Sequence, residues 1–249
     1  MDPNRFVYGL HAVRALITRN PARIAKLWVQ SGREDRKVRE LLALAERHRV
    51  AVGEASATRL DELARGAVHQ GVLAEVRASL DLAEVDLTSL IQSIDGKPLV
   101  LVLDGVQDPH NLGACMRSAD AFGAHAVIIP RDRAAPVTPV VRKVAAGAAE
   151  TIPVVSVVNL ARSLRELKEL GLWIVGADAE AQVAAEATAL DGPLALVIGS
   201  EGEGMRRLTR ETCDLLVKLP LSGTIESLNV AVAAGILLYE VGRQRRAKK

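Results

Sequence analysis

Aromatic residues are scarce in this sequence. Two tryptophans, two tyrosines and two phenylalanines make up only 2% of 249 residues. The core must therefore be built from Leu, Val, Ile and Ala, and stacking of bases on an aromatic platform is disfavoured as a mode of nucleic-acid binding. The hydrophobic content of 49% suffices for one large domain or two small ones, each with its own core.

Cysteine is rarer still, with only two residues. Cys115 and Cys213 both lie inside apolar segments and lack the spacing of metal ligands, so we expect two buried, reduced thiols. The five histidines are scattered, which predicts no metal site. A G-x-S-x-G motif is missing as well, which argues against a hydrolase built on that nucleophile turn.

Long hydrophobic runs are also lacking. No apolar run approaches about 18 residues without a charge or a turn signal, so we expect no membrane-spanning segment. The first residues, MDPNRFVYGLHAV, contain no long apolar stretch of the kind found in signal peptides. The sequence therefore predicts a cytoplasmic protein.

Charge is nearly balanced overall but is unevenly distributed. The net charge is +2, whereas residues 1–77 hold 14 Lys and Arg against 9 Asp and Glu, a net of +5. Residues 243–249 add a basic tail. A basic module suits a polyanionic partner such as RNA. A solvated surface and a frayed terminus explain the same charges equally well.

The composition changes around residues 79–97, SLDLAEVDLTSLIQSIDGK, which are acidic and end in a turn signal before an apolar run. We interpret this stretch as a linker with one short helix at 87–94. It divides the chain into a first domain at 1–78 and a second at 98–249.

The first domain is expected to be a small α/β sandwich of alternating elements. Helical periodicity and apolar runs predict helices at 9–18, 36–47 and 57–64 and strands at 24–30, 50–52 and 71–76.

The second domain is expected to be a doubly wound α/β domain with a mostly parallel sheet. Continuous apolar runs, typical of strands buried on both faces, predict strands at 99–103, 126–129, 152–155, 173–176, 194–198 and 215–219. Helices are expected at 111–122, 138–149, 159–170, 205–213 and 227–245. Ligands in such folds bind at the carboxyl ends of strands, so the loops after Leu103, Ile198 and Leu219 are the candidates for chemistry.

The first of these loops leads to Asn111 and Arg117. Asn111 suits the N-cap of the helix that follows. Arg117 is either a surface arginine or a planar fork placed to bind a phosphate. This loop alone supports a structural role and a functional role of these residues about equally.

The other two loops are rich in glycine and polar residues. Residues 199–205, GSEGEGM, allow close approach of backbone amides to a ligand, but they match neither a dinucleotide-binding motif nor a P-loop. In the third loop Ser227 suits the N-cap of the last helix, while Asn229 can bond to nearby groups. Residues 230–238 are apolar on every side, which predicts a helix buried in the domain or in a subunit interface.

Taken together, the three loops resemble the three motifs of the TrmH branch of the SPOUT methyltransferases. The resemblance is carried by Asn111-Leu112-Gly113 with Arg117, by GSEGEG at 199–204 and by SLNV at 227–230. It extends to the segment LVLDGVQDPHNLGACMRSADAFGAHAVIIP and to YGLHAV and AVHQG near the N-terminus. Within the branch, the chain looks most like the enzymes that methylate guanosine in 23S ribosomal RNA.

The resemblance implies a fold and a cofactor. The second domain would be a SPOUT domain with a trefoil knot, and the first a ribosomal-protein-like domain that binds the 23S rRNA substrate. S-adenosyl-L-methionine would bind against Gly199, Leu219 and Leu228. The family is dimeric, which implies a homodimer through the SPOUT domain.

The resemblance also implies roles in transfer of a methyl group to a ribose 2′-hydroxyl. Arg117 would act on the hydroxyl, and Asn111, Glu201, Ser227 and Asn229 would orient Arg117 and the substrate. We favour Arg117 as an electrostatic clamp because arginine retains its proton; the alternative is a neutral Arg117 acting as base. Two other functions stay open, a tRNA ribose methyltransferase of the same branch and a non-catalytic RNA-binding protein.

Overall fold

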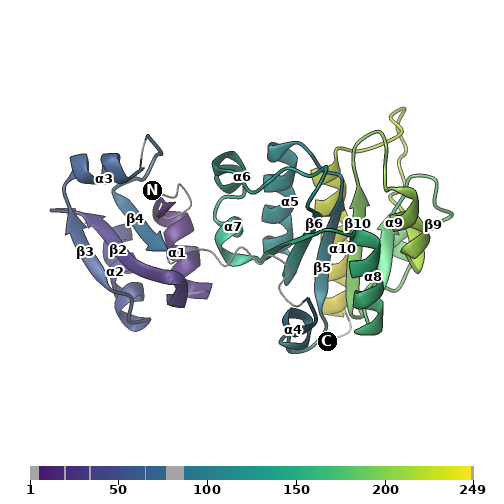
Figure 1. Cartoon of the computed structure of the whole chain (residues 1–249), viewed down its shortest axis with the longest axis horizontal. Helices are drawn as coiled ribbons and strands as arrows, with labels where there is room; N and C mark the ends of the chain where they lie inside the picture. The colour runs from purple at the N-terminus through teal and green to yellow at the C-terminus, as the bar shows by residue number, and fades with distance from the viewer. Residues whose placement is uncertain (1–5, 20, 34, 65, 77–86, 248–249) are drawn as a thin grey trace. The chain divides into compact units, whose positions relative to one another are not determined.

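The computed structural model describes residues 6–19, 21–33, 35–64, 66–76 and 87–247. The chain divides into two compact units (Figure 1). Unit 1 comprises residues 1–81 with 146–151, and unit 2 comprises 82–145 with 152–249.

Of the expected linker at 79–97, residues 79–86 lie outside the described part of the chain. The helix expected at 87–94 is present as α4 (Leu87–Gln92).

Unit 1 is built on a four-stranded sheet with the strand order β1-β4-β2-β3. Strands β1 and β2 both run antiparallel to β4, and β3 runs parallel to β2. The elements are β1 (Phe6–Tyr8), α1 (Leu10–Arg19), the 3-10 turn η2 (Pro21–Arg23), β2 (Ile24–Gln30), α2 (Arg36–Arg47), β3 (Val52–Ala55), α3 (Ala57–Ala64) and β4 (Val72–Val76).

The helices of unit 1 cover both faces of this sheet. The expected apolar stripe of α2, Val38, Leu41 and Ala45, is buried together with α1 in the larger core. Helix α3 closes a smaller core on the other face through Leu60. The α/β class of this domain was thus predicted correctly. Strand β1, whose three residues are too few to show a period, was missed, and the strand expected at 50–52 lies instead at Val52–Ala55 as β3.

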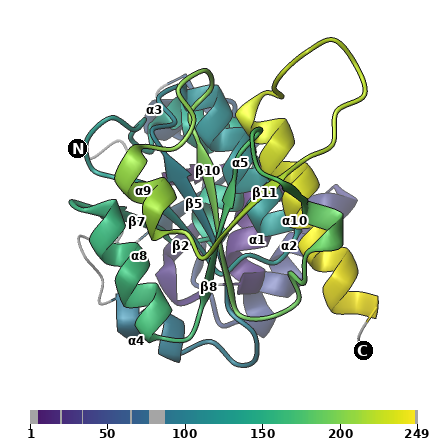
Figure 2. The same cartoon turned by 90° about the vertical axis from the view of Figure 1, so that its right-hand side faces the viewer.

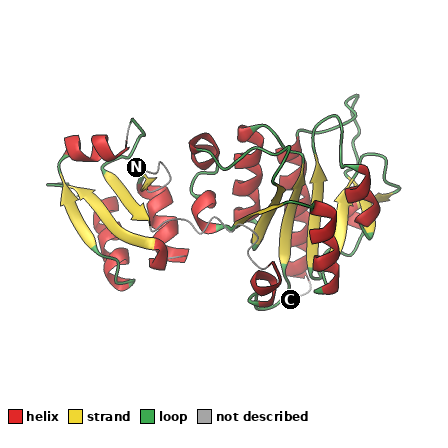
Figure 3. Cartoon of the chain, in the orientation of Figure 1, coloured by secondary structure: helices red, strands yellow, loops and turns green. Residues whose placement is uncertain are grey.

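Unit 2 contains a seven-stranded sheet in which every neighbouring pair is parallel (Figure 3). The order β7-β6-β5-β10-β8-β11-β9 confirms the predicted doubly wound α/β class. The six expected strands are present, and only the two-residue β9 was missed. The strands are β5 (Leu99–Asp104), β6 (Ala126–Pro130), β7 (Val154–Val157), β8 (Trp173–Ala177), β9 (Val183–Ala184), β10 (Leu194–Gly199) and β11 (Leu215–Lys218).

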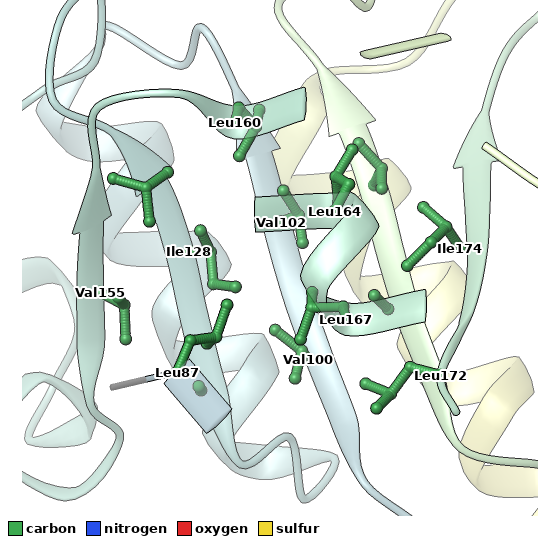
Figure 4. Packing of buried hydrophobic residues seen from close by; sticks show 14 of the residues in the cluster. Leu87, Val100, Val102, Ile128, Val155, Leu160, Leu164, Leu167, Leu172 and Ile174 are labelled. Carbon is green, nitrogen blue, oxygen red and sulfur yellow. The ribbon is translucent and has the colours of Figure 1, made fainter. Parts of the chain in front are cut away.

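Helices pack on both faces of this sheet, with α8 and α9 on one side and α5 and α10 on the other (Figure 2). On the first side Leu160, Leu164 and Leu167 of α8 pack over the central strands (Figure 4). The helices that follow α4 in unit 2 are α5 (Pro109–Ala121), α6 (Pro139–Val144), α8 (Leu160–Glu169), α9 (Arg207–Thr212) and α10 (Val230–Ala247), with the 3-10 turn η3 (Ala185–Ala187). Helix α7 (Ala148–Thr151) belongs to unit 1.

The prediction of a single helix at 138–149 is wrong. Two short helices, α6 and α7, occupy this stretch because Ala146 and Gly147 both adopt positive φ, +51° and +98°. A left-handed backbone ends a right-handed helix, and periodicity of the apolar residues does not reveal such a break.

The two N-caps predicted near the site, Asn111 and Ser227, are also wrong. Helix α5 is capped by Asp108, whose carboxylate accepts from His110 N at 2.9 Å, with Pro109 as its first residue. Helix α10 begins at Val230 and not at 227, and Asn229 Oδ1 accepts from the two following amides. The shift of one cap from Asn111 to Asp108 leaves the Asn111 side chain available for other contacts.

We expect Gly113→Ala to destabilise unit 2. A Cβ at Gly113 would lie 2.7 Å from Val144 Cβ and 2.8 Å from Val141 O, where α5 approaches α6. Overpacking of this kind costs about 1–3 kcal/mol, whereas Ala would otherwise stabilise a helix interior by about 1 kcal/mol relative to Gly. Urea unfolding measures the difference. Gly192→Ala, where a Cβ meets nothing within 4 Å, is the control. A Gly113→Ala protein as stable as the wild type would show that α6 moves away without cost.

Candidate active site

Three polar side chains from distant parts of the sequence meet at the carboxyl edge of the unit 2 sheet. Asn111 lies in the first turn of α5, Glu201 in the loop after β10, and Asn229 directly before α10. Asn229 Nδ2 donates to Asn111 Oδ1 at 2.9 Å and to Glu201 Oε1 at 2.5 Å. Asn111 Nδ2 lies 3.5 Å from the same carboxylate oxygen. We call these residues the polar triad.

The polar triad is tied to the start of α10. Glu201 Oε1 accepts from Val230 N at 3.0 Å, so the carboxylate lies at a helix N-terminus, where exposed amides favour negative charge. Asn229 Oδ1 accepts from Ala231 N and Val232 N at 3.0 and 3.3 Å. Asn229 therefore caps α10 with its oxygen and links α5 to the β10 loop with its nitrogen.

The loop that carries Glu201 is closed on itself. Ser200 N and Gly204 N each donate to the carbonyl of the other, at 3.1 and 3.0 Å. Gly202 and Gly204 adopt positive φ, and a Cβ at Gly199 would collide with the backbone of Gly204 and Met205. Gly199 is thus required by close packing, and Gly202 and Gly204 by their left-handed backbone, whatever ligand binds beside the loop.

An ion pair with a buried carboxylate, which the sequence did not predict, holds the base of this loop. Asp104, at the end of β5, is 1% exposed. Its Oδ1 accepts from Arg206 Nε and lies 2.6 Å from Nη2, and its Oδ2 accepts from Arg206 N at 2.9 Å. A buried carboxylate needs such partners. The signal in the sequence is the single acid that ends the apolar run LVLVLD.

Arg117 and Ser227 stand apart from the polar triad. Both are exposed, and neither side chain makes a hydrogen bond or ion pair with any residue that the structure describes. Arg117 lies on α5, the helix that also carries Asn111, and Ser227 lies two residues before Asn229. The structure therefore brings together three of the five expected catalytic residues.

The three residues expected at the cofactor lie along the same edge. Gly199 ends β10, Leu219 follows β11, and Leu228 precedes Asn229. Both leucines are half-buried. Within the described chain, the main-chain groups of 219–228 make no hydrogen bond. This loop therefore offers backbone donors and acceptors that fit a cofactor held mainly by main chain.

The two cysteines do not contribute a nucleophile. Burial, and secondarily the charge of Glu201, raises the pKa of Cys115 to about 12. Burial raises the pKa of Cys213 to about 12 as well. Both are free thiols, as expected, although Cys213 is only partly buried.

Among the described residues there is no group of three His, Cys, Asp or Glu suited to a metal, and no helix is long and apolar enough to cross a membrane.

Two family models match this chain. Residues 98–239 match the SpoU rRNA Methylase family, and residues 6–81 match a model described as RNA 2′-O ribose methyltransferase substrate binding. The first covers more than half of the sequence.

Relatives match over nearly the whole length. A 23S rRNA (guanosine-2′-O-)-methyltransferase of Pseudomonas putida is 53% identical over 98% of this chain and 98% of its own. An Escherichia coli K12 protein of the same description is 50% identical over 97% of this chain and 99% of its own.

Solved structures share the fold. The SpoU methyltransferase AviRb from Streptomyces viridochromogenes in complex with AdoMet has a TM-score of 0.74 and 26% identity, covering 97% of this chain and 90% of its own. A TrmH/SpoU tRNA modifying enzyme of A. aeolicus has a TM-score of 0.57 and 29% identity, but covers only 66% of this chain and 85% of its own. These matches confirm the resemblance carried by the three loops, and the chain belongs to the SpoU rRNA methylase family.

Proposed function

We propose that this chain transfers a methyl group from S-adenosyl-L-methionine to a guanosine ribose 2′-hydroxyl of 23S rRNA. The observation that carries the proposal is the meeting of Asn111, Glu201 and Asn229 at the carboxyl edge of a SpoU sheet. Relatives that are 50–53% identical over nearly the whole chain are described as 23S rRNA (guanosine-2′-O-)-methyltransferases. We propose that residues 1–78 bind the RNA, that 79–97 form a linker, and that 98–249 form the methyltransferase domain.

The cofactor site is assigned to the two loops beside the polar triad. The free main-chain groups of 219–228, with Leu219 and Leu228, and the backbone at Gly199 would hold S-adenosyl-L-methionine. The cofactor supplies a methyl group activated by its sulfonium. The protein has to hold a poor nucleophile, the ribose hydroxyl, in line with that group.

Arg117 is assigned to the hydroxyl and the neighbouring phosphate. Its exposed guanidinium has no protein partner in the described chain, so it is available to RNA. A planar, permanently charged fork suits an electrostatic clamp. The polar triad would keep α5, and with it Arg117, in a fixed relation to the cofactor loops. Ser227 would bind substrate from the loop that leads to Asn229.

The two alternative functions are less well supported. The tRNA modifying enzyme of A. aeolicus matches only two thirds of this chain, whereas the rRNA enzymes match 97–98% of it, including the substrate-binding region at 6–81. A non-catalytic RNA-binding protein would have no need of the polar triad together with Arg117. We therefore favour the ribosomal substrate and propose that the protein acts in the cytoplasm.

We also propose a homodimer through α10. One face of this helix is buried in its own domain through Val230, Ala234, Leu237, Leu238 and Val241. The other face leaves Val232, Ile236 and Tyr239 exposed, one turn apart. The sequence predicted burial on all sides, and a second copy of the chain would cover this apolar stripe. Because α10 starts at the polar triad, such an interface would lie close to the active site.

The substrate is tested with purified protein, labelled S-adenosyl-L-methionine and 23S rRNA from a strain lacking the modification. We expect 2′-O-methylguanosine at one position after nuclease digestion and mass spectrometry. Unmodified tRNA is the parallel substrate. Methylation of tRNA with none of rRNA would favour the first alternative, and no transfer to either would favour the second.

Arg117→Ala should lower single-turnover methylation about 10²–10³-fold, the usual effect of removing one donor that stabilises a transition state. Arg117→Lys should recover part of the rate because it restores charge without the planar fork. Cofactor affinity, measured by calorimetry, should change little in either variant. Arg162→Ala, which removes an exposed arginine of α8, is the control. Loss of cofactor binding in Arg117→Ala would reassign the residue to a structural role.

Ile236→Asp should convert the dimer into monomers in sedimentation experiments, because it places a charge in the centre of the α10 stripe. Val158→Asp, at another exposed valine of unit 2, should leave the dimer intact. A wild-type chain that sediments as a monomer at micromolar concentration would contradict the proposed interface.

A further inference from the structure

Three loops of unit 1 meet at one end of its sheet. Strands β1 and β2 end there, and β4 begins there, as their pairing of Tyr8 with Leu73 and of Val29 with Val72 requires. Gly9 N donates to Val72 O at 3.1 Å. The segments YGLHAV and AVHQG, which the methyl-transfer chemistry does not use, therefore lie side by side. We call Gly9, Ser31–Arg33 and Val68–Gly71 the loop end.

The backbone of the loop end is unusual. Gly9, Gly32 and Gly71 adopt positive φ of +86°, +74° and +66°, and Gln70 adopts +49° without being a glycine. A left-handed conformation is unfavourable for a residue with a Cβ, and residues held in it concentrate at functional sites. Surrounding contacts must therefore hold Gln70 in place.

The side chains of Arg33 and His69 make these contacts. Arg33 Nη1 donates to Gln70 O, while Arg33 Nε donates to Asp35 at 2.6 Å. On the other side, His69 Nδ1 accepts from Gly71 N at 3.1 Å and His69 Nε2 lies 2.9 Å from Asp61 Oδ1. Because Nδ1 is the acceptor, Nε2 carries the proton and donates to Asp61. Arg33, His69 and two carboxylates are thus occupied in fixing the turn.

The fixed turn presents an apolar and an amide side chain to solvent. Val68 is 79% exposed, and the side chain of Gln70 is exposed beside it. Neither belongs to the two cores of unit 1. Nearby, His11 in the first turn of α1 and Lys37 in the first turn of α2 are exposed and make no side-chain hydrogen bond or ion pair with the described residues. The carboxylates of Asp35 and Asp61, by contrast, are already paired.

We propose that the loop end is the surface by which unit 1 reads unpaired bases of the RNA, with Val68 against a base and the Gln70 amide on a base edge. This inference rests on the proposed function, which supplies RNA as the ligand. Sequence-specific proteins read RNA mostly at unpaired bases, through their faces and hydrogen-bonding edges. A glutamine amide matches paired donor and acceptor groups on a base, and a rigid turn loses little entropy on binding. Lys37 would contact a flanking phosphate.

Two substitutions remove these contacts without disturbing the turn. Val68→Ser removes the exposed methyl groups. Gln70→Gly removes the amide and suits the positive φ, so the backbone is retained. Val52→Ser is the matched control, because Val52 is also exposed, at 42%, but lies at the start of β3, at the opposite edge of the same sheet.

The full-length variants are compared for binding to 23S rRNA, for steady-state methylation, for cofactor affinity and for thermal unfolding. We expect Val68→Ser and Gln70→Gly each to raise the Kd and the KM for rRNA about tenfold, the loss typical of one base contact, with kcat and cofactor affinity unchanged. Val52→Ser should behave as the wild type. The effect of each variant should persist at higher salt, since neither removes a charge.

The proposal is overturned if both variants bind and methylate rRNA as the wild type does, or if Val52→Ser weakens binding as much as they do. Failure of the proposed function is a separate result. A wild-type protein that binds rRNA and transfers no methyl group would refute the enzyme, while the affinities of the variants would still decide the role of the loop end. A wild-type protein that binds no rRNA would refute both.

Discussion

The carboxylate of Glu201 is the contact on which the arrangement of the catalytic edge depends. A single oxygen, Oε1, accepts from the first amide of α10 and from Asn229, and lies near Asn111. It therefore joins the β10 loop to the starts of α5 and α10. The proposed chemistry is mainly positioning, so a fixed relation between these segments matters more than the reactivity of any one side chain.

Glu201 can do this only because its loop is itself fixed. The backbone pair between Ser200 and Gly204 closes the tip, and the contact of the buried Asp104 carboxylate with Arg206 anchors the base to β5. Only a short loop separates Asp104 at the end of β5 from the first turn of α5, which carries Asn111, so the same strand supports both sides of the site. Removal of Arg206 would leave a buried carboxylate unpaired, which makes this pair a requirement of the folded loop.

The sequence predicted the strands of unit 2 well, because parallel strands buried on both faces are continuous apolar runs. It did not predict the caps. Asn111 and Ser227 have the right chemistry for an N-cap, but Asp108 followed by Pro109 outcompetes the first, and Asn229 replaces the second. The Asp104 contact was missed because its partner is 102 residues away. The trefoil knot implied by the resemblance stays a prediction, since strand periodicity carries no information on threading.

The two units use the same physical device at the ends of their strands. In each, an arginine contacts a carboxylate beside a loop that contains left-handed glycines. Arg33 donates to Asp35 and to the carbonyl of Gln70 in unit 1, whereas Arg206 donates to Asp104 through its guanidinium and its own backbone amide in unit 2. The pairs differ in burial, because Asp35 is exposed whereas Asp104 is not. An exposed carboxylate suits the proposed role of the loop end, a surface that would meet a large, hydrated RNA. A buried carboxylate suits a loop that must be held still around a reacting hydroxyl, where small displacements cost most of the rate.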